Sequence, residues 1–415
     1  MRAEASLLCR LTCVESEPSS SVGVGTSVWS EENTMLARSG VGQRRKAGDA
    51  AAVQHPSAYV QLSLPGIAED WPGRAATYPR LRYMGSKHRL LPWISAELRG
   101  LSFHTSLDAF SGSGAVSYLM KCLGKAVTSN DFLLFAHHLT VGAVQNSKHK
   151  IGSSVLNALL ASHRGSEEGF ILQTFRGIFF SPDDLKFLDD VWLNMPALKN
   201  EEQKAIVISA LVRSCLKRQP RGVFSVSGDP EHYKDGRRDL RMSLREHFVE
   251  SLEVFNELVF DNGQKSTSLC GDVFELPGEY DLVYMDPPYV PRADDNCYIK
   301  RYHFLEGLAS NWKAPGTEVL WDTKVHKIPK RFTPFSYRKT AIEAFGRLFE
   351  KFRSSILILS YSSNGYPDLE VLVKLMRSFK SRIRVRERDH KYHFGTHDRV
   401  SDSRTQVREY LIIGE

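Results

Sequence analysis

The sequence predicts an α/β protein in which a mostly parallel sheet carries helices on both faces and a large helical insertion interrupts the sheet. Three observations support this fold class. Short apolar strands alternate with helical segments after residue 77, which is typical of a parallel sheet covered on both sides. The alternation stops between Asp131 and about Ser268, where apolar residues recur at helical spacing instead. It then resumes and continues towards the end of the chain.

The first part of the predicted sheet consists of two strands around a glycine-rich turn. Residues 105–110 have the pattern of a strand that runs into this turn, and an amphipathic helix is expected over 115–123. A second strand is expected over 126–131. Apolar residues then fill a helix over 206–216, so the long segment after the second strand is expected to be mainly helical.

The second part of the sheet follows that segment. Strands are expected over 282–286 and over 355–361, and the second of these is apolar enough to be fully buried. Apolar residues repeat at helical spacing over 369–379, which predicts a helix behind the buried strand. Two alternating segments, 382–388 and 407–413, are expected to form an antiparallel hairpin at the edge of the sheet.

The first 77 residues differ from the rest of the chain. They are rich in Ser, Gly, Ala and Glu, and no helix or strand period persists in them. Such a composition buries too little apolar surface to offset the entropy lost on ordering. We expect a disordered N-terminal extension over 1–77, or an over-extended start of the reading frame.

Composition and charge limit the classes of function. The 415 residues are 42% hydrophobic and 25% charged, which fits a globular protein and excludes collagen-like and wholly disordered chains. The formal net charge is +7, and the excess of Lys and Arg lies after residue 77. Clustered positive charge of this kind favours an acidic partner such as nucleic acid.

The sequence also argues against membrane and metal sites. No segment approaches the roughly 20 apolar residues that span a bilayer, and the start lacks the apolar core of a secretory signal, so a cytoplasmic protein without membrane partners is expected. The six cysteines lack paired metal-ligand spacing and are expected to be reduced and structural. His88, His137 and His138 also lack ligand spacing, and no metal is predicted.

The strongest chemical signal is the tetrapeptide Asp286-Pro287-Pro288-Tyr289, which directly follows an apolar strand. Two prolines stiffen the backbone and lack amide hydrogens, so the loop presents carbonyl oxygens. The Asp286 carboxylate and a carbonyl can together accept both hydrogens of an exocyclic amine, and Tyr289 offers a flat face to a planar base. The alternative is a strand-ending turn with a surface tyrosine.

The second signal is the turn from Leu107 to Gly114, where a strand meets a helix through glycines. Glycines allow a ligand to approach the backbone beside the positive end of a helix. A tight strand-to-helix connection can need the same glycines for steric reasons alone. The next strand ends at Asp131, where an acid can accept hydrogen bonds from a ribose, as in nucleotide-binding sheets.

Motif order and spacing resemble those of the Dam-like, D12 class DNA adenine methyltransferases. Tyr83-Met84-Gly85-Ser86-Lys87 matches the family's first motif. The glycine turn matches as Phe110-x-Gly112-x-Gly114, with Asp108 where Glu is common, and Asp131 matches the acidic ribose position. The remaining matches are Gly271-Asp272-Val273-Phe274, whose acid lies near the cofactor adenine in this family, and the catalytic motif at 286–289.

The resemblance implies a Rossmann-like fold that binds S-adenosylmethionine through Tyr83, Lys87, Asp108, Phe110, Gly112, Gly114, Asp131, Asp272 and Asp286. The implied reaction methylates the N6 amine of an adenine flipped out of duplex DNA, with Asp286, Pro287, Pro288 and Tyr289 as catalytic residues. The implied domains are catalytic over 78–134 and 266–415, with a target-recognition insertion over 135–265. A cognate restriction endonuclease acting separately is a possible partner, and the oligomeric state stays open.

Basic residues in the insertion are candidates for DNA contact. Arg213, Lys217, Arg218 and Arg221 occur within ten residues that hold no acid, and the family places recognition here, where residues 221–226 resemble its Gly-x-Phe-Asn-Val segment. A solvated charged face is the alternative reading. A second basic run from Lys324 to Lys339 is an equal candidate for phosphate contact or a solvated surface, and Tyr298 and Tyr302 are candidates for pocket walls.

Two further hypotheses remain open at the level of sequence. The same acidic tip serves RNA base methylation in other Rossmann-like methyltransferases, although those typically lack a large insertion at this point. A non-catalytic DNA-binding module that keeps the cofactor site only for folding is the other alternative, and the intact motif at 286–289 argues against it.

Overall fold

The computed structural model describes residues 72–163, 168–225, 236–291, 297–391 and 406–415. Most of the predicted extension therefore lies outside the described residues. Its last residues are folded: Gly73–Thr77 form a short 3₁₀ helix, η1, in which Ala75 is buried. The folded part thus begins a few residues before Tyr78, because Ala75 and Tyr78 both join the hydrophobic core.

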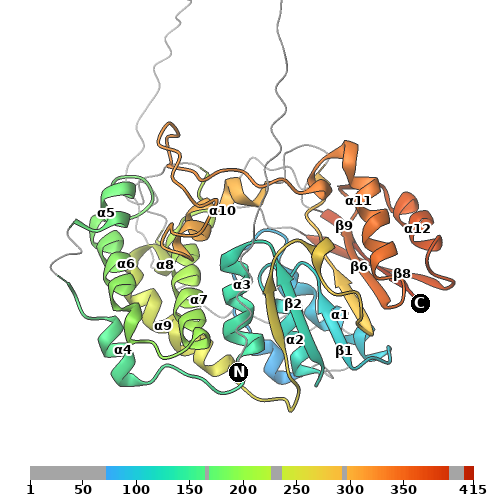
Figure 1. Ribbon diagram of the computed structural model, residues 1–415, viewed down its shortest axis with the longest axis horizontal. Coiled ribbons are helices and arrows are strands. Elements are labelled where there is room, and N and C mark those ends of the chain that lie inside the picture. Colours follow the sequence, from blue (N-terminus) through green and yellow to red (C-terminus); the bar gives the residue numbers. More distant parts are fainter. Residues whose placement is uncertain (1–71, 164–167, 226–235, 292–296, 392–405) are drawn as a thin grey trace, which may run out of the picture. The chain divides into compact units, whose positions relative to one another are not determined.

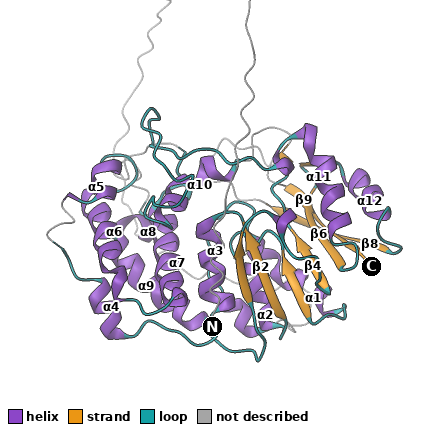
Figure 2. Ribbon diagram, in the orientation of Figure 1, coloured by secondary structure: helices purple, strands orange, loops and turns teal. Residues whose placement is uncertain are grey.

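A seven-stranded sheet has the strand order β3-β2-β1-β4-β6-β9-β8, and Figure 2 draws its strands in orange. The strands are β1 Thr105–Asp108, β2 Ala126–Asp131, β3 Thr267–Cys270, β4 Leu282–Met285, β6 Ile356–Ser362, β8 Ile383–Lys391 and β9 Gln406–Gly414. The pairings among β3, β2, β1, β4 and β6 are parallel, and β9 is antiparallel to both of its neighbours. The predicted α/β class with a mostly parallel sheet is confirmed.

Most strands lie where the sequence predicts them, with two differences. The hairpin of β8 and β9 is present, but only β8 is the edge, since β9 pairs with β6 as well. Strand β3 was not predicted, because only one of its four residues is buried and an apolar pattern is therefore absent. A small second sheet pairs β5 Val290–Pro291 with β7 Gly365–Tyr366.

The hydrophobic core consists of one cluster on each face of the sheet. Successive residues of β4 alternate between them: Leu282 and Tyr284 belong to one cluster, and Val283 and Met285 to the other. The first cluster includes residues of α1 Leu91–Arg99 and α2 Ala115–Cys122, and the second includes residues of α11 Arg338–Lys351 and α12 Leu369–Arg377. Figure 1 shows α11 and α12 side by side at the red end of the chain.

The segment between β2 and β3 is helical, as expected. Its helices are α3 Leu134–Thr140, α4 Ser153–Leu159, α5 Phe170–Phe175, α6 Pro182–Asn194, α7 Glu201–Arg218, α8 Arg238–Arg241 and α9 Leu244–Leu258. Asn200 caps α7, and a capping box of Ser243 and Glu246 begins α9. Residues of α7 join the same core cluster as α2, and α3 links them, since it packs on both α7 and β2. A separate domain over 135–265 stays a prediction.

The remaining short elements are η2 Lys87–Leu90, the π-helical turn η3 Val141–Gln145, η5 Met195–Ala197, η7 Val273–Glu275, α10 Tyr298–Leu308 and η8 Pro334–Ser336. Within the described part of the chain, no helix is both long and apolar enough to cross a membrane.

The chain order of the strands places a switch point beside β1. The chain moves from β1 outwards to β2 and β3, and then returns to β4 on the other side of β1. In open α/β sheets, ligands bind at the carboxyl ends of the strands at such a point. Asp108 ends β1, Asp131 ends β2, and Asp286 directly follows β4.

Candidate active site at the carboxyl ends of the strands

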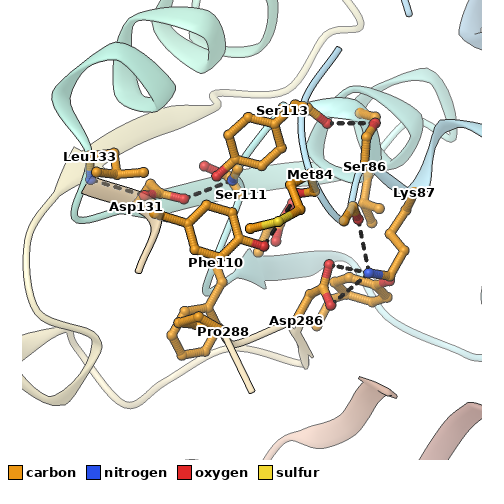
Figure 3. A pocket seen from close by; sticks show the side chains of 18 of the residues that line it. Met84, Ser86, Lys87, Phe110, Ser111, Ser113, Asp131, Leu133, Asp286 and Pro288 are labelled. Atoms are coloured by element: carbon orange, nitrogen blue, oxygen red, sulfur yellow. Dashed lines mark hydrogen bonds and ion pairs between the residues drawn. The ribbon is translucent and has the colours of Figure 1, made fainter. Parts of the chain in front are cut away.

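A cleft with an unfilled volume of about 580 Å³ opens at this switch point (Figure 3). The structure brings together here seven of the residues predicted to bind the cofactor: Tyr83, Lys87, Asp108, Phe110, Gly112, Asp131 and Asp286. Asp286 faces the same cleft as Gly112, which is the arrangement the predicted chemistry requires.

Gly112 lies where the backbone of the turn and an aromatic ring approach each other closely. Its φ is +49°, and an added Cβ would lie 3.1 Å from the ring of Tyr83. The Gly112 amide donates to Oδ2 of Asp131 at 2.7 Å. A side chain at this position would therefore strain the turn and fill the cleft.

Gly114 lies in its predicted turn position, but it packs against the scaffold and does not line the cleft. It has φ of +78° and caps α2, and an added Cβ would lie 2.5 Å from the Tyr78 hydroxyl. Gly114 is not among the residues that line the cleft. The geometry therefore supports the alternative in which the tight strand-to-helix connection needs this glycine for steric reasons alone.

Asp131 fixes the shape of the glycine turn. Its Oδ2 accepts from Gly112, and its Oδ1 accepts from the Leu133 amide at 2.9 Å. Burial raises the pKa of Asp131 to about 6, although these backbone hydrogen bonds act in the opposite direction. Each oxygen retains a second lone pair, so the carboxylate can also accept from a ligand hydroxyl.

Asp108 offers an unused acceptor in the cleft. Its Oδ2 accepts from the Ser117 hydroxyl at 2.6 Å, whereas its Oδ1 is buried and has no hydrogen-bond partner within the described residues. The same is true of Ser111 Oγ in the neighbouring turn. Burial, the largest cause, raises the pKa of Asp108 to about 7. Both atoms are therefore available as hydrogen-bond partners for a polar ligand in the cleft.

Lys87 and Asp286 form a buried ion pair across the cleft. The Lys87 ammonium donates to both oxygens of Asp286, at 2.8 and 2.6 Å, and to the Gly85 carbonyl at 3.0 Å (Figure 3). The side chain of Lys87 is 6% exposed and that of Asp286 is 18% exposed. Burial alone would lower the pKa of Lys87, but the carboxylates of Asp286 and Glu409 raise it above its ordinary value.

The Lys87 ammonium also counteracts the effect of burial on its partner. Burial raises the pKa of Asp286, and the charge and hydrogen bonds of Lys87 lower it. The pKa of Asp286 stays above its ordinary value, and the cationic lysine limits this rise and so favours the carboxylate form. Sequence reasoning assigned Lys87 to the cofactor and missed this pairing, because 199 residues separate the two side chains.

The rest of the catalytic motif divides between the cleft and the scaffold. Pro288 lines the cleft, whereas Pro287 is buried and is not among the lining residues. Tyr289 is half-buried, and its ring packs against Tyr361 with centroids 5.0 Å apart. An added Cβ at Gly365 would lie 2.9 Å from the Tyr289 ring. The absence of a side chain at Gly365 therefore makes room for this ring. The predicted stacking of Tyr289 on a base stays a prediction.

Tyr298 and Tyr302 hold the turn that carries Lys87. The Tyr302 hydroxyl accepts from the Met84 amide at 2.7 Å, and the Tyr298 hydroxyl donates to the Met84 carbonyl at 3.2 Å. The ring of Tyr302 stacks on Tyr83 with centroids 5.1 Å apart. Tyr298 lines the cleft as predicted, whereas Tyr302 is buried behind it and acts through Tyr83 and Met84.

Asp272 caps a short helix. Its carboxylate accepts from the Phe274 amide at 2.9 Å at the start of η7, and it is not among the lining residues. Sequence reasoning missed other residues that line the cleft: Met84, Ser86, Ser111, Ser113, Phe132, Leu133 and Tyr284. The hydroxyl oxygens of Ser86 and Ser113 lie 3.3 Å apart, within hydrogen-bond distance. Only their positions inside the matched motifs could have indicated from the sequence that these two serines line the cleft.

The basic residues predicted to contact DNA are mostly paired inside the helical segment. Lys217 bonds Glu250 at 3.3 Å, and Arg218 bonds Asp184 at 3.1 Å. Arg213 is partly buried and donates to Ser251 Oγ at 2.8 Å, while Arg221 is exposed. These contacts hold helices together, and contact of these three residues and of the exposed Arg221 with phosphates stays a prediction.

The geometry defines a class of protein. An open α/β sheet with carboxylates at three neighbouring strand ends, a glycine turn and an acidic Pro-Pro loop is a Rossmann-like transferase site. Residues 83–316 match the model of the D12 class N6 adenine-specific DNA methyltransferases, and the chain belongs to this family. It is therefore an adenine-specific DNA methyltransferase that requires a methyl donor.

Individual relatives agree with this family. The chain is 27% identical to the Type II methyltransferase M2.HphI of Haemophilus parahaemolyticus. This match spans 329 residues and covers 76% of this chain and 92% of the relative. It is 25% identical to the Type II methyltransferase M.FokI of Planomicrobium okeanokoites and 24% identical to the modification methylase StsI of Streptococcus sanguinis. These two matches cover 72% of this chain and about half of each relative.

Proposed function

We propose that this enzyme transfers the methyl group of S-adenosylmethionine to the N6 amine of an adenine flipped out of duplex DNA. The observation that carries the proposal is the position of Asp286, which lies in the wall of a cleft with unpaired acceptors for a donor molecule. One cleft therefore offers a site for the donor and an acceptor for the amine.

The polar groups of the cleft fit S-adenosylmethionine. Oδ1 of Asp108 suits the ammonium group of the donor, and the carboxylate of Asp131 suits ribose hydroxyls. Phe110 and Phe132 supply apolar walls nearby. When bound, this donor supplies a methyl group on a positively charged sulfur, which is already a good electrophile. The task left to the protein is to orient the amine towards it, which can contribute several powers of ten in rate.

Asp286 and the Pro287 carbonyl are the proposed acceptors for the two hydrogens of the adenine amine. The nitrogen lone pair is delocalised into the ring, and hydrogen bonds from both N–H groups favour tetrahedral geometry. They also stabilise the positive charge that develops on nitrogen during attack. Lys87 supports this role because its positive charge favours the carboxylate form of Asp286, while each carboxylate oxygen retains a further lone pair.

The proposed substrate is duplex DNA, in which the target adenine is paired. Extrusion of the base costs a few kcal/mol, and stacking on Tyr289 would offset part of this cost. The helical segment between β2 and β3 is the proposed reader of the recognition sequence, with Arg221 among its exposed basic residues. Because relatives carry restriction-modification names, a separately acting cognate endonuclease is a proposed partner.

Donor affinity is expected to rise with pH through neutrality. The pKa of Asp108 is raised by burial to about 7, so at pH 6 the group is mostly protonated, and a cationic ligand must displace that proton. Affinity for S-adenosylhomocysteine, measured by calorimetry, should increase about tenfold between pH 6 and pH 8. Asp108→Asn should bind weakly with little dependence on pH. The same pH dependence in this variant would contradict the role of Asp108.

The reaction itself is tested with labelled S-adenosylmethionine and DNA from a host without methylation. Nucleoside analysis is expected to find the label in N6-methyladenine. Label in cytosine, in structured RNA in preference to DNA, or in no nucleic acid would overturn the proposed function. Sequencing of the product then gives the recognition site.

A further inference from the structure

The connection between α10 and α11 carries a pair of exposed aromatic rings. Phe332 is 67% exposed and Tyr337 is 50% exposed, and their rings stack with centroids 5.1 Å apart and planes 18° apart. A single exposed aromatic residue needs no explanation. Two rings stacked on each other form a continuous apolar platform, and the contacts of the active site do not account for it.

This ring pair lies beside the active site. Tyr337 lines a second, smaller cavity together with Arg331 and Thr333, which flank Phe332 in the chain. Both cavities share the walls Phe132, Pro288 and Tyr298. Because Pro288 belongs to the catalytic motif, the ring pair lies next to the loop that is proposed to receive the target base. Figure 1 shows the connection in orange as it runs from α10 to α11.

The surface around the ring pair is basic. Between Asp322 and Glu343 the chain holds no acidic residue, and it holds the basic residues Lys324, Lys327, Lys330, Arg331, Arg338 and Lys339. Arg331 pairs with the buried Glu306 at 3.0 Å. Lys324, Lys330, Arg338 and Lys339 are exposed, and no carboxylate within the described ranges forms an ion pair with them.

The combination of flat rings and unneutralised cations fits nucleic acid. Phosphates at regular spacing complement the cations, and the π faces of bases complement exposed rings. Extrusion of an adenine also leaves its partner base unpaired and its neighbours partly unstacked. A site beside the catalytic loop is therefore where a stacking surface would be used.

We propose that Phe332 and Tyr337 form a stacking platform for an unpaired base of the substrate DNA, and that Lys330, Arg338 and Lys339 hold the adjacent phosphates. This inference rests on the proposed function, since it takes duplex DNA as the substrate. It assigns the second basic run of the sequence to DNA contact and gives the two rings a positioning role, separate from methyl transfer itself.

The platform is tested by comparing two DNA probes in fluorescence anisotropy. One is a mixed-sequence duplex of about 30 base pairs, and the other is the same duplex with one unpaired adenine. The wild-type protein is expected to bind the second probe more tightly. Phe332→Ala and Tyr337→Ala should each weaken binding to that probe by about 5- to 150-fold, with a much smaller effect on the paired duplex. Val371→Ala, which removes a 38% exposed apolar side chain on α12, is the matched control and should change neither affinity.

The charges are tested separately from the rings. The double variant Lys330→Gln/Lys339→Gln should weaken binding to both probes equally and lower the slope of log affinity against log salt by about two. Lys374→Gln, an exposed lysine on α12, should leave this slope unchanged. Unchanged affinity for S-adenosylhomocysteine in every variant establishes that the donor cleft remains folded.

The outcomes separate this inference from the proposed function. If wild-type protein labels adenine in DNA but both ring variants keep the preference for the unpaired adenine, the platform is overturned and the function stands. If the ring variants lose binding to a single-stranded RNA and not to either DNA probe, the DNA assignment of the platform is overturned. If wild-type protein labels no DNA, the proposed function fails whatever the binding results.

Discussion

Replacement of Asp286 by asparagine is expected to lower the rate of methyl transfer to DNA by about 10²- to 10³-fold. Asparagine has nearly the same shape as aspartate, but it lacks the negative charge and presents an N–H₂ group. The N–H₂ group of the asparagine would face the Lys87 ammonium and the substrate amine. Both of these are hydrogen-bond donors, so they need an acceptor in this place. Single-turnover labelling of DNA with excess enzyme measures the loss directly, because product release does not enter the rate.

The matched control for this variant is Asp281→Asn. Asp281 precedes β4 and accepts backbone hydrogen bonds from His104 and Thr105, both at 2.8 Å, outside the cleft. This control should retain the wild-type rate. An undiminished rate in Asp286→Asn, with donor binding intact, would show that the carboxylate is not the acceptor for the amine.

Replacement of Lys87 by methionine is expected to cost about 3 to 5 kcal/mol in the free energy of unfolding at neutral pH, because it leaves the Asp286 carboxylate buried without its counter-charge. The pKa of Asp286 would then rise further, since burial raises it and the opposing lysine is gone. A carboxyl group with a raised pKa in the folded state loses stability as pH rises. Urea unfolding should therefore show a smaller deficit at pH 5 than at pH 8.

Activity should change in the same variant. With Asp286 protonated over a wider range, the acidic limb of the pH–rate profile should move to higher pH. The double variant Lys87→Met/Asp286→Asn removes both charges and should be more stable than Lys87→Met alone. Lys121→Met is a control, since that buried lysine bonds only the carbonyls of Ala143 and Asn146 among described groups and should leave the pH–rate profile unchanged. A Lys87→Met profile identical to wild type would contradict the ion-pair account.

The fold was largely predictable because its strands carry a local signal. Strands β4 and β6 are buried and apolar, whereas β1 and β2 are more polar but end in acids, with a glycine turn after β1. Composition identifies the first pair and turn chemistry the second. Strand β3 lacks this signal, because a short edge strand with one buried residue derives its conformation from pairing with β2.

The topology of the sheet made the position of the cleft predictable from the sequence. The ion pairs in and around the cleft were not predictable in this way. Parallel strands end at one edge of a sheet, so Asp108, Asp131 and Asp286 meet there whatever the intervening sequence. Ion pairs depend on contacts between distant segments. From the sequence alone, Lys217 and Arg218 are expected to form an unpaired basic face on their helix. In the structure they form ion pairs with Glu250 and Asp184, which lie on other helices.

The central claim is that Asp286 holds the adenine amine within reach of the donor cleft. A crystal structure of the enzyme with sinefungin and a duplex that contains its recognition site measures this most directly. The account predicts an extrahelical adenine with N6 within about 3.2 Å of a carboxylate oxygen of Asp286. An adenine that remains stacked in the duplex, or an N6 bonded elsewhere while Asp286 contacts only Lys87, would contradict it.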